Sequence, residues 1–299
     1  TRCSRDWSSD VCSSDLSYPA RVVIVLIKTY LQGLRDYWLQ SLGRNPMEDW
    51  VKVRWALQGV RRLKQQPDRR KRPITPQMLL SFLTVLPLES SFQVCSFTAM
   101  VIAFFGFFRK SNVTVASPSL FDASKHLRRG DVRVDLHRYC LWVSVRWSKT
   151  LQFGERVLEV PIVGMQGHPL DPVAWWQRLC AAVPGTAESP AFCYVDENGA
   201  LQILTHAAFV KQTKALVAKV GLDPNTVSGH SFRRGGATFA ALAGVPAELI
   251  KLQGDWRSSA YELYIVFPPS QKLSTTELMW SRIRKGSFWG ELHCEQHRS

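Results

Sequence analysis

Between Ser228 and Ile265 the chain gathers the side chains best suited to chemistry. His230 and Arg233 lie three residues apart at an expected helix start, so both should project from one face. An arginine can fork onto two phosphate oxygens, and a histidine can accept a proton near neutral pH. Tyr264 can supply a phenolate nucleophile. These residue types suit the cleavage of a phosphodiester, which needs a nucleophile, positive charge at the phosphate oxygens and a proton for the leaving oxygen.

The segments that carry these residues are expected to be helical. The pattern predicts helices over 231–243 and 247–253, joined by the turn Gly244-Val245-Pro246, and a short helix over 259–266. Gly235 and Gly236 lack a Cβ, so they allow another part of the backbone to approach the first helix closely. Tyr264 would lie on the third of these helices.

The remainder of the chain predicts a mainly α fold with a small antiparallel β-sheet inserted, an α+β class. Three short segments after Arg109 alternate between apolar and polar residues, as antiparallel strands do. The segment 92–107 is apolar nearly all round, which is typical of a helix in the middle of a core. The expected helices are 20–43, 47–65, 78–86, 92–107, 172–182 and 206–220, and the expected strands are 131–136, 139–147 and 156–163.

The order of motifs from Ser228 to Ile265 resembles the tyrosine recombinase and integrase family. A His-x-x-Arg opens a small-residue helix, and a Gly-Val turn, a second helix, a Gly-x-Trp and a Tyr-Ile eight residues beyond the Trp follow. A lone His-x-x-Arg is a weak signal, but the ordered combination is specific. The resemblance covers most of residues 20–285. It is strongest to the recombinases of eukaryotic mobile elements, which have a similar RKSN and a similar Trp-to-Tyr spacing.

The resemblance implies further catalytic residues and their roles. The family's first arginine follows a buried helix and matches Arg109 in GFFRKSN, and its catalytic lysine lies between two strands and matches Lys149 in RWSKTLQFGER. By the resemblance, Tyr264 attacks the phosphorus, and Arg109 and Arg233 hold the phosphate oxygens. His230 accepts the tyrosine proton or hydrogen-bonds the phosphate. Lys149 protonates the departing 5′-hydroxyl.

Each assignment also has a competing interpretation. Tyr264 could be a core tyrosine, with Tyr261 as a rival nucleophile, although the spacing from Trp256 favours Tyr264. At two positions a neighbouring basic residue could be the true match: Lys110 in place of Arg109, and Arg234 in place of Arg233. At three positions the residue could have an ordinary structural role: Arg109 as a helix cap, Lys149 as a hairpin lysine, and His230 as a helix cap.

Two positions depart from the family pattern. Many members carry an acidic residue three positions after the first arginine, where this chain has Asn112. Many carry a histidine nine residues before the tyrosine, where this chain has Asp255. We take Trp256 as the equivalent residue, since an indole can pack the site and donate its N–H. A carboxylate would repel a phosphate, so Asp255 is expected to face away from the site.

The chain divides into five expected regions. The stretch DWSSDVCSSDL resembles a translated sequencing-library adapter, so we expect residues 1–16 to be an artefact. By the resemblance, residues 17–66 are the C-terminal part of a truncated helical core-binding domain and residues 76–285 are the catalytic domain. A basic linker, 67–75, separates the two, and a tail, 286–299, follows. The segment 275–284 could be either a helix exchanged between protomers or a simple terminal helix.

The formal net charge of +14 and pI of about 9.7 favour a polyanionic partner such as nucleic acid. The expected DNA contacts run along the second helix and the linker, and they would be dominated by the phosphate backbone, so affinity should be salt-sensitive. The basic run 69–72 could also act as a nuclear import signal if the host is eukaryotic. The predicted DNA-binding residues are Arg61, Arg62, Lys64, Arg69, Arg70, Lys71 and Arg72.

Other classes of protein fit the sequence less well. No apolar run approaches the roughly 18 residues needed to span a bilayer. The seven cysteines form no CxxC or Cys/His ligand pattern, which favours a reducing, intracellular compartment. This compartment would be the nucleus in a eukaryotic host and the cytoplasm or nucleoid otherwise. No acidic cluster suggests a metal pair and no glycine-rich loop suggests ATP, so we expect no cofactor.

We therefore expect an enzyme, a DNA recombinase or integrase of a mobile element that acts through a 3′-phosphotyrosyl intermediate. It would assemble as a dimer or tetramer on double-stranded DNA. The alternatives are a degraded remnant that binds DNA without cutting it, and an enzyme similar to type IB topoisomerases.

Overall fold

The computed structural model describes residues 20–43, 51, 55, 58–59, 71–147, 156–256, 259–266 and 269–284. The chain forms two compact units, residues 1–70 and residues 71–299. In the first unit, helix α1 runs over Ala20–Leu42 and exposes large apolar side chains such as Tyr30 and Leu34. The expected basic residues Arg61, Arg62, Lys64, Arg69 and Arg70 lie outside the described residues.

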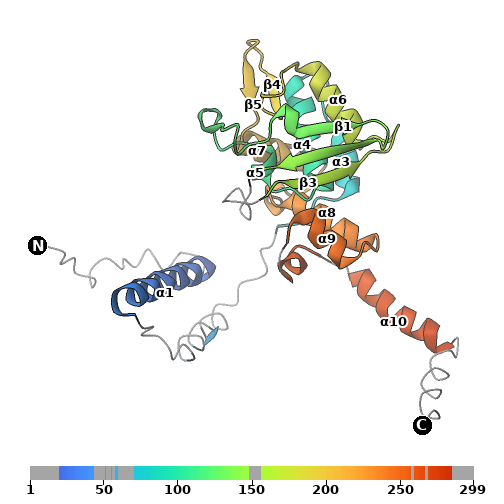
Figure 1. Cartoon of the computed structure of the whole chain (residues 1–299). Coiled ribbons are helices and arrows are strands. Elements are labelled where there is room, and N and C mark those ends of the chain that lie inside the picture. Colours follow the sequence, from blue (N-terminus) through green and yellow to red (C-terminus); the bar gives the residue numbers. More distant parts are fainter. Residues whose placement is uncertain are drawn as a thin grey trace, which may run out of the picture. The chain divides into compact units, whose positions relative to one another are not determined.

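The second unit is mainly helical and carries two small antiparallel sheets, so the expected fold class is confirmed (Figure 1). Its α-helices are α3 (Pro76–Leu83), α4 (Ser91–Phe105), α5 (Lys110–Val113), α6 (Pro172–Ala182), α7 (His206–Lys219), α8 (Ser231–Leu242), α9 (Ala247–Gly254) and α10 (Pro269–Arg284). Its strands are β1 (Val132–Asp135), β2 (Cys140–Val145), β3 (Leu158–Val163), β4 (Cys193–Val195) and β5 (Leu201–Ile203). Single 3₁₀ turns occur at Pro118–Leu120, Arg129–Asp131, Pro224–Thr226 and Ser259–Leu263.

Side-chain caps fix where several of these helices begin. The Thr75 hydroxyl accepts a hydrogen bond from the Met78 amide at 3.2 Å, and Pro76 occupies the first helical position of α3. Asp171 caps α6 and Thr205 caps α7 in the same manner. Local sequence therefore determines these boundaries, because each cap satisfies an amide that the helix itself leaves unpaired.

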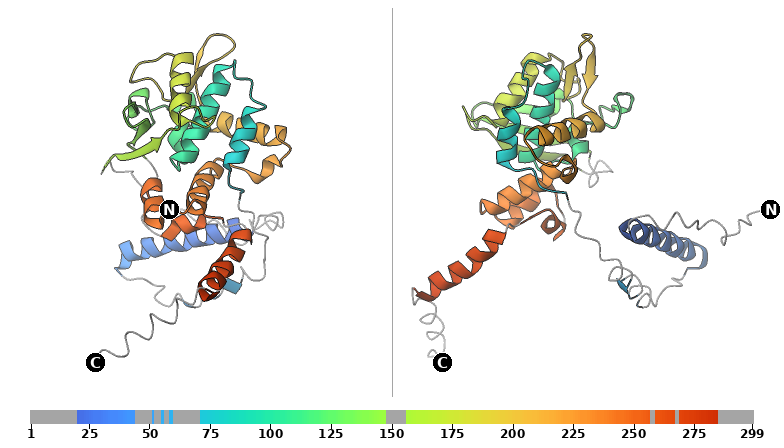
Figure 2. Two further views of the ribbon diagram at one scale, coloured as in Figure 1. Left: turned by 90° about the vertical axis from the view of Figure 1, so that its right-hand side faces the viewer. Right: turned by 180° about the vertical axis from the view of Figure 1, so that it is seen from behind.

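The larger sheet has the strand order β1-β2-β3, with both pairs antiparallel. Val145 at the end of β2 pairs with Leu158 at the start of β3, so the connection that contains Lys149 joins those two strand ends. The second sheet is the hairpin β4–β5, which projects as a separate feature in two views (Figures 1 and 2) and was not expected from the sequence. The segment 259–266, expected to be an α-helix, instead contains the 3₁₀ turn Ser259–Leu263.

Helix α4 is the centre of the core, as its nearly all-round apolar composition predicts. Eleven of its residues, from Val94 to Phe104, are buried. It contacts α6, α8 and β4, while α6 also contacts β2 and β3. Helix α4 is thus enclosed by both helices and sheet, and the chain that leaves its C-terminal end is held in a fixed place.

Helix α8 approaches its neighbours backbone to backbone, and two adjacent glycines make this possible. A Cβ on Gly235 would collide with the carbonyl of Ile74, and a Cβ on Gly236 would collide with the carbonyl of Phe104. Backbone atoms cannot move aside as a flexible side chain can.

We therefore expect Gly236→Ala to lower the free energy of unfolding by about 1–3 kcal/mol. Gly33→Ala is the matched control, because Gly33 also lies in a helix but nothing lies within 4 Å of a Cβ placed there. Urea titration followed by circular dichroism would measure both. Equal midpoints for the two variants would contradict the close approach of α8.

Candidate active site

Arg109 lies in the short connection between α4 and α5. Gly106 caps α4, Phe107 adopts a left-handed backbone with φ of 51°, and Arg109 precedes the first turn of α5. The amide of Arg109 donates a hydrogen bond of 3.0 Å to Oδ1 of Asn112. Asn112 therefore caps this turn with an amide oxygen, and this role needs no carboxylate.

The guanidinium of Arg233 is the centre of the site. Arg233 lies in the first turn of α8 and is only 2% exposed. Its Nη1 donates to the carbonyl of Phe107 at 2.5 Å, and its Nη2 donates to the carbonyl of Gly254 at 2.6 Å. Two carbonyls from distant parts of the chain thus fix the plane of the guanidinium. Its Nε is buried and has no hydrogen-bond partner among the described residues.

Two aromatic rings cover this guanidinium. The Cζ atom of Arg233 lies 3.9 Å from the centroid of the Trp256 ring and 5.4 Å from that of Tyr264. The two rings lie 5.3 Å apart. A Cβ on Gly254 would collide with the Trp256 ring, so this glycine leaves the space that the indole occupies. The indole N–H is buried and, within the described part of the chain, without an acceptor.

Burial and, to a smaller extent, the nearby charge of Arg109 lower the pKa of Arg233 to about 9, although Tyr264 and Asp255 act in the opposite direction. The guanidinium therefore remains protonated at neutral pH. Arg109 and Arg233 place two positive charges close together, an arrangement that is costly in the absence of an anion.

Tyr261 and Tyr264 occupy different environments. Tyr261 is 9% exposed and belongs to a small apolar cluster with Phe107, Ile250 and Trp256, and the ammonium of Lys251 lies 5.0 Å from its ring. Tyr264 packs against the edge of that cluster and is only partly buried. Of the two rival tyrosines, Tyr264 is the one that lies beside Arg233 and retains access to solvent.

His230 precedes α8 and is exposed. Its side chain makes no capping hydrogen bond, which argues against the alternative that it merely caps the helix. Partial desolvation lowers its pKa below the usual value of 6.5, and the charges of Arg109, Arg233, Lys110 and Arg234 lower it further. His230 thus lies among four cations and favours its neutral form, which can accept a proton.

This shift predicts a pH dependence of stability. A histidine whose pKa is lower in the folded protein binds a proton more readily in the unfolded chain. The contribution of His230 to folding stability is therefore fully present above the unfolded pKa of about 6.5, and it is lost as the pH falls below that value. We expect the melting temperature of the wild type to fall more steeply below pH 6.5 than that of His230→Gln. His206, whose pKa is also lowered, is present in both proteins and cancels in the difference. Parallel curves measured by scanning fluorimetry would contradict the prediction.

Lys149 lies outside the described residues, as do 148 and 150–155. The strand ends on both sides of it are placed, however. Val145 and Leu158 line a small hollow together with Arg109 and Arg233. The connection that contains Lys149 therefore starts and ends at the wall of the same hollow.

Asp255 departs from expectation, because it does not face away from the site. It lines the hollow with Arg109 and Arg233, and it ends α9 in a left-handed conformation with φ of 52°. Its carboxylate forms an ion pair with Arg156, from the residues just before β3. Sequence reasoning did not single out Arg156. Arg156 is the first residue of an expected strand, but no sequence pattern identifies Asp255 as its partner.

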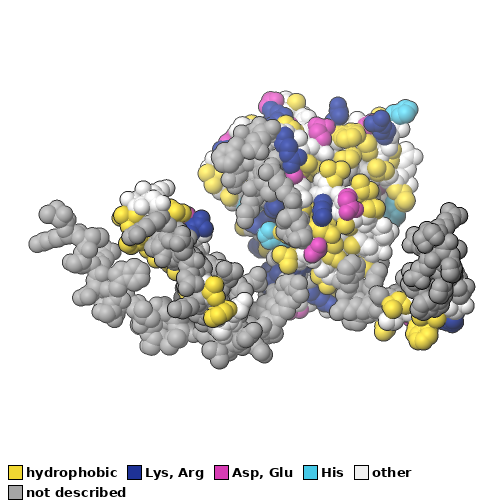
Figure 3. All heavy atoms as spheres, turned by 60° about the horizontal axis from the view of Figure 1, so that its bottom comes forward, with side chains coloured by type: hydrophobic (Ala, Val, Ile, Leu, Met, Phe, Trp, Pro, Cys, Tyr) yellow, Lys and Arg dark blue, Asp and Glu magenta, His cyan; other side chains and the backbone are white. Residues whose placement is uncertain are grey.

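The end of the basic linker lies beside α8. The Arg234 guanidinium donates to the carbonyl of Lys71 at 2.7 Å and to that of Leu263 at 3.0 Å, and the Arg72 amide donates to the carbonyl of Thr226 at 2.6 Å. Lys71 and Arg72 are exposed there. Arg234 thus connects the linker, α8 and the segment that carries Tyr264, whereas Arg233 lies against the rings of Trp256 and Tyr264. On the face brought forward in Figure 3, Lys and Arg side chains lie among apolar ones and several lie near a histidine.

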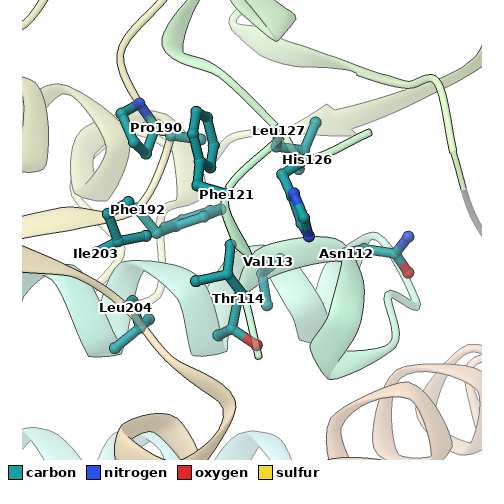
Figure 4. Close-up of a pocket in the computed structure, with 12 residues that line it drawn as sticks. Asn112, Val113, Thr114, Phe121, His126, Leu127, Pro190, Phe192, Ile203 and Leu204 are labelled. Carbon is teal, nitrogen blue, oxygen red and sulfur yellow. The ribbon is translucent and has the colours of Figure 1, made fainter. Parts of the chain in front are cut away.

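A second hollow lies between α5, β4–β5 and the segment 121–127 (Figure 4). Its lining is mostly apolar, including Phe121, Phe192 and Leu204. Asn112 lies at its edge with its side chain directed away from the other labelled residues (Figure 4). Its Oδ1 accepts the hydrogen bond from the Arg109 amide. We assign no chemistry to this hollow.

The described residues contain no group of three His, Cys, Asp or Glu side chains placed to hold a metal ion. Among the described helices, none combines the length and the apolar character that crossing a bilayer would require.

Comparisons with known proteins support a fold assignment. No family model matches the chain, and no curated protein matches it either. A solved structure of the Tn1549 transposon integrase with transposon right end DNA is similar at a TM-score of 0.56 and 15% identity, covering 90% of this chain and 82% of that one. The same integrase with circular intermediate DNA gives a TM-score of 0.54 and 16% identity over 88% and 80% of the two chains.

The fold expected from the sequence motifs is therefore the observed one. In this fold, Arg109 after α4, His230 and Arg233 at the start of α8 and Tyr264 after α9 lie near one another. The chain has the fold of the tyrosine recombinase catalytic domain.

Proposed function

We propose that this protein is a tyrosine recombinase that cuts and rejoins double-stranded DNA through a 3′-phosphotyrosyl intermediate, and that a mobile element encodes it. One observation carries the proposal: Arg233 is held by two carbonyls at the centre of a group formed by Arg109, His230, Trp256 and Tyr264. This group combines two permanent cations, a neutral base, an indole N–H and a phenol, which is the set that phosphodiester cleavage requires.

The reaction follows from these positions. Arg109 and Arg233 bind the non-bridging oxygens of the scissile phosphate, and the indole N–H of Trp256 donates a hydrogen bond to one of them. The Tyr264 oxygen attacks phosphorus and forms the new P–O bond, while its proton passes to His230. The bond to the 5′-oxygen breaks, and Lys149 supplies the proton to that oxygen. The new phosphodiester conserves the energy of the broken one, so religation needs no ATP.

The two aromatic rings over Arg233 add one step to the proposed reaction. Trp256 and Tyr264 lie over its guanidinium, so a phosphate reaches Arg233 only after the Tyr264 ring turns aside. The 3₁₀ turn that precedes Tyr264 is anchored by the buried ring of Tyr261, whereas Tyr264 lies at the edge of the same apolar cluster and is only partly buried. The nucleophile can therefore move while the turn stays anchored.

The proposed partners follow from the same chemistry. Lys71 and Arg72, with the basic residues before them, would contact the DNA backbone, and two DNA sites would be brought together by a tetramer. The integrase structures similar to this chain are bound to DNA, which supports a DNA substrate.

Trapping the covalent intermediate would test the proposal without a known target site. The full chain is incubated with labelled duplexes that carry a nick within a randomised centre, so that the short product diffuses away after cleavage. Protein-bound DNA is then precipitated with SDS and potassium. We expect label in the precipitate that proteinase digestion releases. DNA binding without any precipitated label would instead support the second candidate, a DNA-binding remnant, which the covering of Arg233 favours. Relaxation of supercoiled plasmid would indicate topoisomerase activity.

A further inference from the structure

Asp255 places a carboxylate at a site that must receive an anion. It lines the same hollow as Arg109 and Arg233, and it lies close enough to Arg233 to raise the pKa of that guanidinium. A negative charge there offsets part of the attraction that the two arginines exert on a phosphate.

The backbone leaves Asp255 little freedom to move away. The residue before it accepts a hydrogen bond from Arg233 through its carbonyl, and the residue after it stacks on the same guanidinium. Two positions earlier, Gln253 donates to the carbonyl of Phe105 and to that of Pro161 on β3, both at 3.2 Å. The end of α9 is thus fixed between α4, α8 and β3.

Arg156, which is not itself part of the lining of the hollow, forms an ion pair with this carboxylate. It lies two residues before β3, at the end of the connection that contains Lys149, and its guanidinium pairs with Asp255. The Asp255 side chain is 9% exposed, whereas that of Arg156 is 43% exposed. The ion pair is therefore partly buried, and charge interactions are stronger in a partly buried position than at an open surface.

We propose that Arg156 is a positioning residue that neutralises Asp255, so that Arg109 and Arg233 keep their full attraction for the scissile phosphate. With Arg156 paired to Asp255, the charges of Arg109, Arg233, Asp255 and Arg156 sum to +2, the charge that the two arginines of the hollow alone would provide. The inference rests on the proposed recombinase function, because it assigns Arg156 to the phosphate site of that reaction.

Four proteins test the inference with the nicked duplex recovered from the adduct assay. We expect Arg156→Ala to slow adduct formation about 10- to 100-fold, because Asp255 loses one counter-charge next to the phosphate. Arg156→Lys keeps the charge and should stay within a few-fold of the wild type. The decisive protein is Arg156→Ala combined with Asp255→Asn, which should recover most of the lost rate. The amide removes the negative charge and tolerates the left-handed conformation.

The double variant separates neutralisation from a purely structural link. If Arg156 served only to brace the turn before Trp256, removing both partners would leave the brace missing and the rate low. Arg138→Ala, an exposed arginine at the β1–β2 turn, is the control for a general loss of positive charge. Anisotropy should show DNA affinity changing much less than the rate, because most backbone contacts lie elsewhere.

The possible results separate a failure of the Arg156 inference from a failure of the proposed recombinase function. Adduct formation at the wild-type rate by Arg156→Ala would overturn the inference and leave the recombinase proposal standing. No recovery in the double variant would also overturn it. If the wild type forms no adduct at all, the proposed function fails. In that case the affinity of each variant for the randomised nicked duplex tests the inference. Neutralisation of Asp255 by Arg156 still predicts that Arg156→Ala binds this DNA more weakly and that the double variant recovers the affinity.

Discussion

Replacing Tyr264 by phenylalanine is expected to abolish the covalent protein–DNA adduct, with a loss of a thousand-fold or more, roughly the scale on which removing a nucleophile acts. The ring remains and can still pack at 5.3 Å from Trp256, so the fold should be unchanged. Only the oxygen that would bond to phosphorus is removed. The adduct is counted by SDS–potassium precipitation, and the melting temperature and DNA affinity are measured in parallel.

Tyr261→Phe is the matched control for this prediction. It removes a hydroxyl from a ring three residues away that is packed in the apolar cluster with Phe107 and Ile250. We expect its adduct yield to stay within about threefold of the wild type, since its ring packing is retained. Loss of the adduct in Tyr261→Phe, with Tyr264→Phe still active, would move the nucleophile to Tyr261.

Arg233→Lys should have the second largest effect, although it conserves the charge. A lysine cannot donate to the carbonyls of Phe107 and Gly254 in one fixed plane, and its compact ammonium does not stack on Trp256 as a guanidinium does. A buried carbonyl would then lack a donor, at a cost of about 1–3 kcal/mol in stability. We expect adduct formation to fall by about a hundred- to a thousand-fold, the range seen when one donor to a developing oxyanion is lost.

Arg178→Lys is a control with matched geometry. Arg178 also lies over a tryptophan, with its Cζ atom 5.3 Å from the Trp175 ring, and it also donates to a carbonyl, that of Leu88 at 3.3 Å. It lies on α6 and not at the hollow, so its substitution should leave the rate of adduct formation near the wild-type value. Rates are compared at a temperature where circular dichroism shows both variants folded. An Arg233→Lys rate within tenfold of the wild type would contradict the central place of this guanidinium.

Much of the fold could be predicted from local patterns. The buried helix α4, the three strands β1 to β3 and the capped starts of α3 and α6 all lie close to their expected ranges, because periodicity and caps act over a few neighbouring residues. The hairpin β4–β5 was missed, since strands of three residues are too short to show alternation. The apolar spacing before Tyr264 predicts an α-helix, whereas the structure has a 3₁₀ turn, because this spacing fits both.

Local sequence likewise predicts some features of the candidate site and not others. The spacing of His230 and Arg233 predicted that both would serve one site, and helical geometry alone is sufficient for that inference. The pairing of Arg156 with Asp255 joins residues 99 positions apart, and no local pattern encodes it. For that reason Asp255 was expected to face away from the site, whereas it lies at the hollow with its charge paired.

Propensity, periodicity and capping are local properties, so the order of residues is sufficient to predict which side chains are available and which helices and strands carry them. The packing of the folded chain, in contrast, makes the carbonyls of Phe107 and Gly254 orient Arg233, places Tyr264 and not Tyr261 beside it, and brings Arg156 to Asp255. Those contacts depend on how α4, α8 and α9 pack, and packing is settled by the shape and volume of the whole core, not by neighbouring residues in the chain.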